Sequence, residues 1–191
     1  MMYIEKATPR HARGILDIYK PALENTAASF AVKAPSIDEI RLKIEHTIVR
    51  YPWLVYVVES QVAGYAYANI HRSREAYQWS VEPSVYVHPN HRNKGIGKSL
   101  YTTLFNILTY QNFEKAVAII TIPNEASIAL HKSFGFEHVG VFKKAGYKLG
   151  KWHDTSWWEL NLRNNINSKP KTIIPFKDIE KDQLNNLING S

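Results

Sequence analysis

The amino-acid sequence predicts one mixed α+β domain, a sheet with helices on both faces. The first basis is hydrophobic periodicity, which runs in the order strand, two helices, three strands, helix, strand, helix and two strands. The second is size and composition, because 191 residues with 45% hydrophobic content suffice to bury a core. The whole sheet is therefore expected to belong to a single domain.

The chain is predicted to begin with a strand and two helices. Met2–Lys6 fits a short strand, and Pro9–Asn25 fits a helix with one apolar side. Pro21 lies inside that range and predicts a kink or a break. Ser36-Ile37-Asp38-Glu39 is a capping box, so a second helix should start there and run to about Arg50.

The remaining elements alternate between strands and helices. The expected strands are Trp53–Glu59, Val62–Ile70, Gln78–Val87, Lys115–Ile122, Phe136–Ala145 and Trp152–Leu162. The expected helices are Gly95–Tyr110 and a shorter one from Asn124 to about Ser133. From residue 163 the composition shifts to Asn, Lys and Pro, so we divide the chain into a domain, 1–162, and a polar tail, 163–191, with a possible short helix over 176–188.

Composition excludes several kinds of chemistry. The chain has no cysteine, which rules out disulfides and an acyl-cysteine intermediate. The histidines lack metal-ligand spacing, so no metal site is expected. No apolar run approaches a membrane span and the N-terminus lacks a signal-peptide core, which predicts a cytoplasmic protein without membrane attachment. The net charge of +7 favours anionic ligands, but the basic residues form no long run, so nucleic-acid binding is not expected.

The most informative segment is the turn that follows the strand ending at Val87. A basic turn leads there into a helix that opens with Gly95 and Gly97, and this junction gathers unpaired backbone N–H groups and a positive dipole end. Glycine also lets a ligand approach the backbone closely. The spacing lacks the Walker Gly-Lys-Ser/Thr and the third glycine of a dinucleotide fingerprint. The pattern favours a phosphate-bearing ligand, and a plain strand-to-helix turn with surface lysines is the alternative.

These motifs resemble the GNAT acetyltransferases. Arg92-x-x-Gly95-x-Gly97 is similar to their pyrophosphate loop, and the segment from Asn124 to Gly135-Phe136 is similar to their second motif. Residues 74–82, 51–55 and 146–154 look like the phosphinothricin acetyltransferase branch, and the similarity covers residues 2–162. The resemblance implies the GNAT fold, a central, mostly antiparallel mixed sheet of about seven strands. It also implies acetyl-CoA as cosubstrate and a homodimer, with Tyr147–Asp154 a candidate contribution to the neighbouring subunit's site.

The resemblance assigns the central strand and the loop after it to catalysis and cofactor binding. Glu82 occupies the position of the general base that deprotonates the acceptor amine. A solvent-facing carboxylate or a pair with Arg74 is the alternative. Pro83 is a departure from the branch and is expected to remove a ladder hydrogen bond. The Val87 N–H would polarise the thioester carbonyl. The cofactor-binding set is Val85, Tyr86, Val87, Arg92, Asn93, Lys94, Gly95, Ile96, Gly97, Lys98 and Asn124.

The other family positions each carry two interpretations. Asn124 either reaches the cofactor or caps a helix. His131 either delivers a proton to the departing thiolate or fills the end of a short helix. Arg74 matches a residue that holds the substrate's anionic group, against a solvated loop cation. Phe30 and Tyr77 either line the substrate pocket or pack in the core.

The sequence therefore predicts an N-acetyltransferase that acts on a small amino-acid-like amine by direct transfer in a ternary complex. The branch suggests phosphinothricin, methionine sulfoximine or methionine sulfone as acceptor. Transfer to a peptide N-terminus or a polyamine is one alternative, although Arg74 disagrees with the acidic pocket a polyamine needs. A non-catalytic acyl-CoA-binding module is another.

Overall fold

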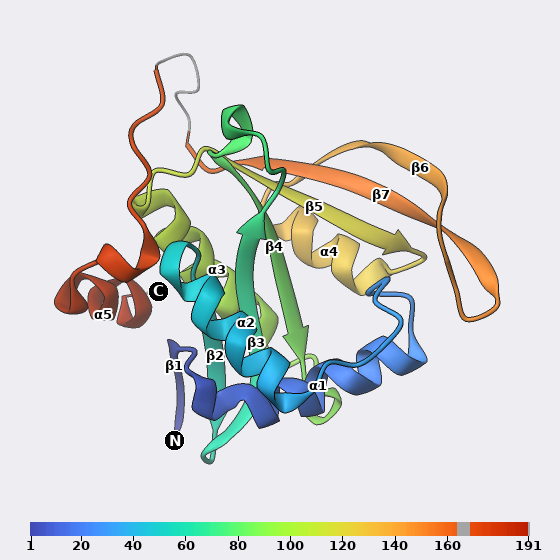
Figure 1. Cartoon of the computed structure of the whole chain (residues 1–191), viewed down its shortest axis with the longest axis horizontal. Coiled ribbons are helices and arrows are strands. Elements are labelled where there is room, and N and C mark those ends of the chain that lie inside the picture. The colour runs from blue at the N-terminus through green and yellow to red at the C-terminus, as the bar shows by residue number, and fades with distance from the viewer. Residues whose placement is uncertain (164–168, 191) are drawn as a thin grey trace.

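A computed structural model of the chain describes residues 1–163 and 169–190. Within them lies one seven-stranded sheet in the order β1-β2-β3-β4-β5-β7-β6, with helices on both faces (Figure 1). The β4–β5 pair is parallel and the other neighbours are antiparallel, which confirms the predicted fold class. The strands are β1 (Met2–Lys6), β2 (Trp53–Val58), β3 (Gln61–Ile70), β4 (Ser80–Val87), β5 (Lys115–Ile122), β6 (Glu137–Lys148) and β7 (Lys151–Asn161).

The helices are α1 (Ala12–Asn25), α2 (Ile37–Arg50), α3 (Ile96–Tyr110), α4 (Glu125–Ser133) and α5 (Lys181–Asn189). The capping box forms as expected, since Ser36 accepts a hydrogen bond from the Glu39 amide and the Glu39 side chain accepts one from the Ser36 amide. Of the two outcomes expected at Pro21, a kink or a break, the break does not occur, because α1 continues through Pro21 to its expected end at Asn25. Leu23, in the turn after the proline, is 1% exposed, and its packing holds that turn in place.

Two apolar clusters lie on opposite faces of the sheet. One lies between the sheet and the pair α1 and α2, and Trp53 and Tyr65 are among its members. The other lies under α3 and α4 and contains the predicted apolar side of α3, whose residues Ile96, Leu100, Leu104, Ile107 and Leu108 are all buried. The long β6–β7 hairpin extends from one end of the molecule, and α5 lies at the other (Figure 1).

The C-terminal segment contributes to the main core. Ile173, Phe176 and Ile179 are buried in the cluster that also contains α3. Three side chains of the body hold its backbone: Trp79 Nε1 donates to the Lys171 carbonyl at 2.8 Å, and Gln111 and Asn112 donate to neighbouring carbonyls at 2.7 and 2.9 Å. The part of the tail that the structure describes is thus packed against the domain. The helix α5 starts inside the predicted helical range 176–188 and ends one residue beyond it, at Asn189.

Candidate active site

The site is built where β4 and β5 stop pairing. Among the described residues the ladder joins only Ser80 with Lys115 and Val81 with Ala116. Beyond Val81 the two strands diverge, although β4 continues to Val87 and β5 to Ile122. The divergence leaves one edge of β4 without a neighbouring strand inside the sheet.

The register shows which amides lie on that open edge. The His88 amide donates to the Ala63 carbonyl at 2.9 Å, so in the antiparallel ladder the even-numbered residues of β4 bond to β3. The amides of Val85 and Val87 therefore face the side where β5 has left. The backbone nitrogen of Pro83 faces the same side, at a position beyond the last β4–β5 pair. Because no strand lies opposite it there, the missing N–H does not remove a hydrogen bond from the ladder, contrary to the expectation.

Tyr86 differs from its two neighbours because its backbone groups point to β3. Its ring stacks on Tyr65 at 5.2 Å and meets Tyr19 of α1 edge-on at 5.5 Å. Burial raises the pKa of the Tyr86 phenol well above its ordinary value, which keeps the hydroxyl protonated. Its side chain belongs to the aromatic packing below α1.

The glycine turn places a helix N-terminus beside this edge. Gly95 is the N-cap of α3 with φ of +78°, and it offers no capping side chain to the amides of the first turn. A Cβ added there would meet nothing within 4 Å, so the space in front of the turn is open. A Cβ added at Gly97 would lie 3.6 Å from Leu130 and 3.7 Å from Val87, which shows that this turn packs directly on β4 and α4.

The surroundings of the turn are basic. Arg92, Asn93 and Lys98 are exposed, and the exposed Lys94 folds back to donate to the Asn90 carbonyl at 3.0 Å. Uncapped amides, the positive end of a helix and these cations together suit an anionic group such as a diphosphate. The residues present thus fit the phosphate-bearing part of the expected cosubstrate.

Glu82 lies on the same face of β4 as Tyr86 and has a specific partner. Its carboxylate is 2.8 Å from Nδ1 of His71, while its side chain stays 36% exposed. The Tyr77 ring meets the His71 ring edge-on at 6.1 Å, so this histidine connects two predicted site residues. Arg74 is exposed at the N-cap of the short helical turn 75–77, and it is not the partner of Glu82.

His71 was missed in the sequence, although the hairpin register indicates it. Asn69 pairs with Glu82 across β3 and β4, and His71 is two residues further along the same face. Diagonal neighbours of this kind lie within reach of long side chains. The contact follows once this register is known, but the long connection between β3 and β4 does not fix the register from the sequence.

His131 is enclosed in the protein. It is 4% exposed, its Nδ1–H donates to the Ser127 carbonyl at 2.7 Å, and Nε2 lies 3.2 Å from the Tyr101 hydroxyl. Burial lowers the pKa of His131, and the bond to Ser127 opposes this only in part. The ring is therefore neutral at pH 7, with Nε2 accepting from Tyr101.

Asn124 caps α4, as one of its two interpretations predicted. Its Oδ1 accepts a hydrogen bond from the Ser127 amide at 3.2 Å. The cap lies directly after β5, on the far side of the divergence from β4. The Asn124 side chain is half-buried, so the cap leaves part of it accessible.

Phe30 lies against the turn end of the β6–β7 hairpin, where Gly146 pairs with His153. A Cβ added at Gly146 would come within 2.6 Å of the Phe30 ring, so a larger residue there would displace the ring from this position. Lys148, which the sequence analysis missed, is 7% exposed and donates to the carbonyls of Leu23 and Ser29 at 2.7 and 2.6 Å. Burial lowers the pKa of its ammonium group. Among the described residues Lys148 forms no ion pair with a carboxylate, and a lysine bonded to backbone carbonyls gives no pattern in the sequence, which is why this anchor of the α1–α2 loop was not expected.

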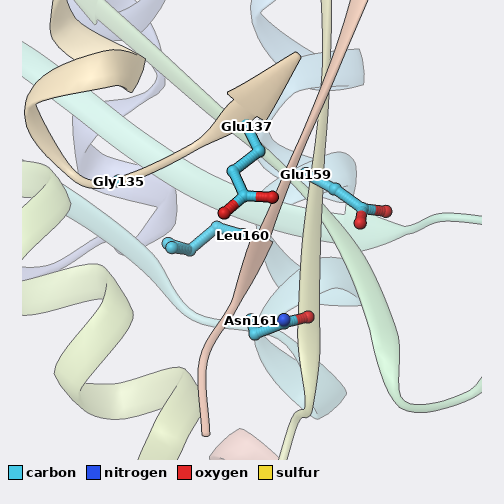
Figure 2. A pocket seen from close by; sticks show the side chains of 5 residues that line it. All are labelled: Gly135, Glu137, Glu159, Leu160 and Asn161. Carbon is cyan, nitrogen blue, oxygen red and sulfur yellow. The ribbon is translucent and has the colours of Figure 1, made fainter. Parts of the chain in front are cut away.

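A separate hollow of about 150 Å³ lies away from these residues (Figure 2). Glu137, Glu159 and Asn161 line it, at the end of the sheet where β4 and β5 begin. Glu159 is paired with Lys115 at 2.9 Å. The turn at Gly95 follows the opposite end of β4, so this hollow does not belong to the candidate site.

Comparison with known proteins identifies the family. The family model described as the acetyltransferase (GNAT) domain matches residues 4–157, which is most of the chain. This protein belongs to the GNAT acetyltransferases. The glycine turn and the diverging strands described above are thus parts of an acetyltransferase domain.

Several relatives match over nearly their full length. A phosphinothricin N-acetyltransferase of Streptomyces viridochromogenes is 36% identical over 92% of this chain and 95% of its own. An L-methionine sulfoximine/L-methionine sulfone acetyltransferase of Salmonella typhimurium is 34% identical over 84% of this chain and 95% of its own. The solved structure of a GNAT superfamily phosphinothricin acetyltransferase from Sinorhizobium meliloti, in complex with acetyl-CoA, has a TM-score of 0.86 and 34% identity, covering 93% of this chain and 97% of that one.

Two findings bear on the remaining expectations. In the described part of the chain, no helix combines the length and the hydrophobicity that crossing a bilayer requires. Among the same residues, no group of three or more His, Asp or Glu side chains is arranged to hold a metal ion.

Proposed function

We propose that this GNAT enzyme transfers the acetyl group of acetyl-CoA to the amine of a small amino-acid-like acceptor of the phosphinothricin, methionine sulfoximine or methionine sulfone type. The observation that carries the proposal is the open edge of β4, with the uncapped turn at Gly95 at one end and the carboxylate of Glu82 beside it. The names of the relatives support the acceptor class.

The cosubstrate is held by backbone groups. The first-turn amides of α3 bind the diphosphate, and the basic turn adds attraction. The Val85 and Val87 amides supply hydrogen bonds along the open edge, and the Val87 N–H faces the thioester carbonyl as its oxygen gains charge. Acetyl-CoA supplies the activated acyl group, so the protein needs no nucleophile of its own.

The acceptor is prepared by Glu82. An ammonium group cannot attack a thioester until it loses a proton, and the partly exposed carboxylate of Glu82, on the face of β4 next to the open edge, can accept that proton directly or through water. Arg74 would hold the acceptor's carboxylate or phosphinate through its guanidinium fork. Phe30 and Tyr77 would contribute aromatic walls to the acceptor pocket.

The two interpretations of His131 make different demands on its ring. A proton donor needs a protonated or exchangeable nitrogen facing the thiolate, whereas both nitrogens here bond inside the protein. We infer that His131 mainly joins α4 to Tyr101 of α3 and so fixes the helix that packs on Gly97. The departing thiolate then takes its proton from solvent or another group.

A second copy of the chain is the proposed partner. The β6–β7 hairpin exposes a series of large apolar side chains, more than an isolated domain usually leaves in water. They are Val139, Val141, Phe142, Tyr147, Leu149 and Trp152, from 40% to 62% exposed. We expect a homodimer through this hairpin, which sedimentation of the protein and of Phe142→Lys would test. The cytoplasmic location stays a prediction.

The test of the activity is acetyl-CoA-dependent thiol release with phosphinothricin, methionine sulfoximine, methionine sulfone, ordinary amino acids, polyamines and a peptide mixture. Glu82→Gln should lower kcat by about 10²- to 10⁴-fold, the usual range for a general base. Glu159→Gln is the matched control, because Glu159 is also a half-exposed strand glutamate with a basic partner but lies outside the site. Equal losses in both variants, or acetyl-CoA binding without turnover on any amine, would count against the proposal.

A further inference from the structure

The contact between His71 and Glu82 is built into the fold. β3 and β4 pair without a register shift from Gly64/Val87 to Ile70/Val81, so the loop that begins at His71 starts at a fixed distance from Glu82. The His71 side chain is only 10% exposed. Its ring is enclosed edge-on by Tyr77 at 6.1 Å and by Trp157 of β7 at 6.5 Å. A buried ring with one defined neighbour on each side is held more firmly than a surface ion pair.

The chemistry of the two groups fixes the direction of the hydrogen bond. An ionised carboxylate can only accept, so Nδ1 of His71 carries the hydrogen that lies between the two side chains at 2.8 Å. This bond engages Oε1 of Glu82 and fixes the plane of the carboxylate. The other oxygen, Oε2, is then the one left to accept a proton from a substrate.

We propose that His71 is the positioning residue of the general base and that protonation of its ring turns the base off; this inference rests on the proposed function. With the ring neutral, the N–H bond of the acceptor's ammonium breaks and its proton moves to Oε2, while the Nδ1–H bond to Oε1 stays intact. With the ring protonated, its positive charge stabilises the ionised carboxylate and weakens it as a proton acceptor, and it also repels the incoming ammonium.

The described residues that contact the ring come from three elements. From β4 the facing group is Glu82, and from the short helical turn 75–77 it is the Tyr77 phenol. The Arg72 guanidinium lies over the Tyr77 ring at 5.6 Å, so its charge is nearby but constant. β7 contributes Trp157, which has no charge.

Two substitutions of His71 test separately its hydrogen bond to Glu82 and the positive charge of its protonated ring. His71→Asn places an amide N–H where Nδ1 was, so it keeps the hydrogen bond to Glu82 but cannot be protonated. His71→Phe keeps an aromatic ring between Tyr77 and Trp157 but has no hydrogen bond to offer. Loss of packing alone would affect Asn more than Phe, which is the reverse of the order expected from the proposal.

The experiment is the pH dependence of kcat and kcat/KM with an accepted amine for the wild type and both variants. We expect His71→Phe to lower kcat about tenfold at pH 8 with less change in acceptor KM, since one charge-assisted bond is lost. We expect His71→Asn to stay within about threefold of wild type at pH 8, and to keep its activity at lower pH than the wild type does. Wild-type kcat in His71→Phe would overturn the positioning role, and an unchanged acid limb in His71→Asn would overturn the switch.

A second readout does not depend on turnover. The ¹⁵N spectrum of the histidine side chains reports which ring nitrogen carries hydrogen, and His71 should show hydrogen on Nδ1 in the wild type. Glu82→Ala should abolish that preference if the carboxylate imposes it. Failure to acetylate any amine, with this NMR result intact, would reject the proposed function and leave the coupling standing. Active enzyme whose His71 tautomer ignores Glu82→Ala would reject the coupling alone.

Discussion

Two glycines that combine a positive φ with open space around them allow the placement of the cosubstrate to be tested against backbone strain. Gly95 and Gly150 have φ of +78° and +76°, and a Cβ added at either would meet nothing within 4 Å. Gly95→Ala and Gly150→Ala should therefore cost the same stability, about 1–2 kcal/mol for a non-glycine residue in the left-handed region. For a protein of this size that corresponds to a fall in Tm of roughly 2–8 °C.

Only one of these substitutions is expected to change the affinity for acetyl-CoA. The methyl group at residue 95 would occupy the open space in front of the α3 N-terminus, where the diphosphate is proposed to bind, whereas Gly150 lies in the β6–β7 turn. We expect Gly95→Ala to weaken acetyl-CoA binding at least about tenfold, or 1.4 kcal/mol, and Gly150→Ala to leave it unchanged. Titration calorimetry on both folded variants measures this. Equal affinities would refute the proposed position of the diphosphate. Alanine is preferable to valine at residue 95, because a β-branched side chain adds strain at positive φ.

Three further predictions concern the surroundings of the site. Lys148→Met should destabilise the protein by about 2–4 kcal/mol, because two carbonyls lose a charged donor, and should speed proteolysis between α1 and α2; unchanged cleavage in that loop would contradict its role as anchor. Phe176→Ala should cost about 3–5 kcal/mol in urea unfolding, against almost nothing for Val32→Ala at an 83% exposed position; similar values for both would mean that the C-terminal segment is not part of the core. The pKa of His131 is lowered by folding, so the unfolded chain binds the extra proton first and stability falls as pH drops below about 6.5. His131→Asn should lose less stability than wild type between pH 7.5 and 5, and parallel pH curves would argue against a buried neutral imidazole.

Local signals in the sequence accounted for the elements that depend on local physics. The capping box at Ser36 predicted the start of α2, and the apolar run of β5 predicted both of its ends. A break at Pro21 did not occur, because the rule for proline in helices considers one lost hydrogen bond, whereas the burial of Leu23 stabilises the last turn. The motifs at Gly95 and Asn124 indicated the family, and Gly95 indicated the turn before α3, although neither depends on how the strands pair.

The features that escaped the sequence depend on contacts between distant segments. His71 meets Glu82 only through the β3–β4 register, and Lys148 meets Leu23 across more than a hundred residues. The tail looked polar in composition, yet Phe176 is buried, because a few apolar residues at the right spacing suffice to pack a segment. Residue-type patterns do not contain this information, since nothing in the local sequence says which carbonyl or carboxylate a side chain will face.

The divergence of β4 from β5 has a consequence for the protein when its cosubstrate is scarce. Unpaired strand edges normally lie at the margins of a sheet, where charges, prolines or bulges protect them from pairing with other chains. Here an unpaired edge lies in the middle of the sheet, where β4 and β5 diverge, and a bound ligand would serve as the missing strand. Ligand and folding are then linked by mass action, so the supply of acetyl-CoA would set how much of the protein survives heat and proteases as well as how fast it works.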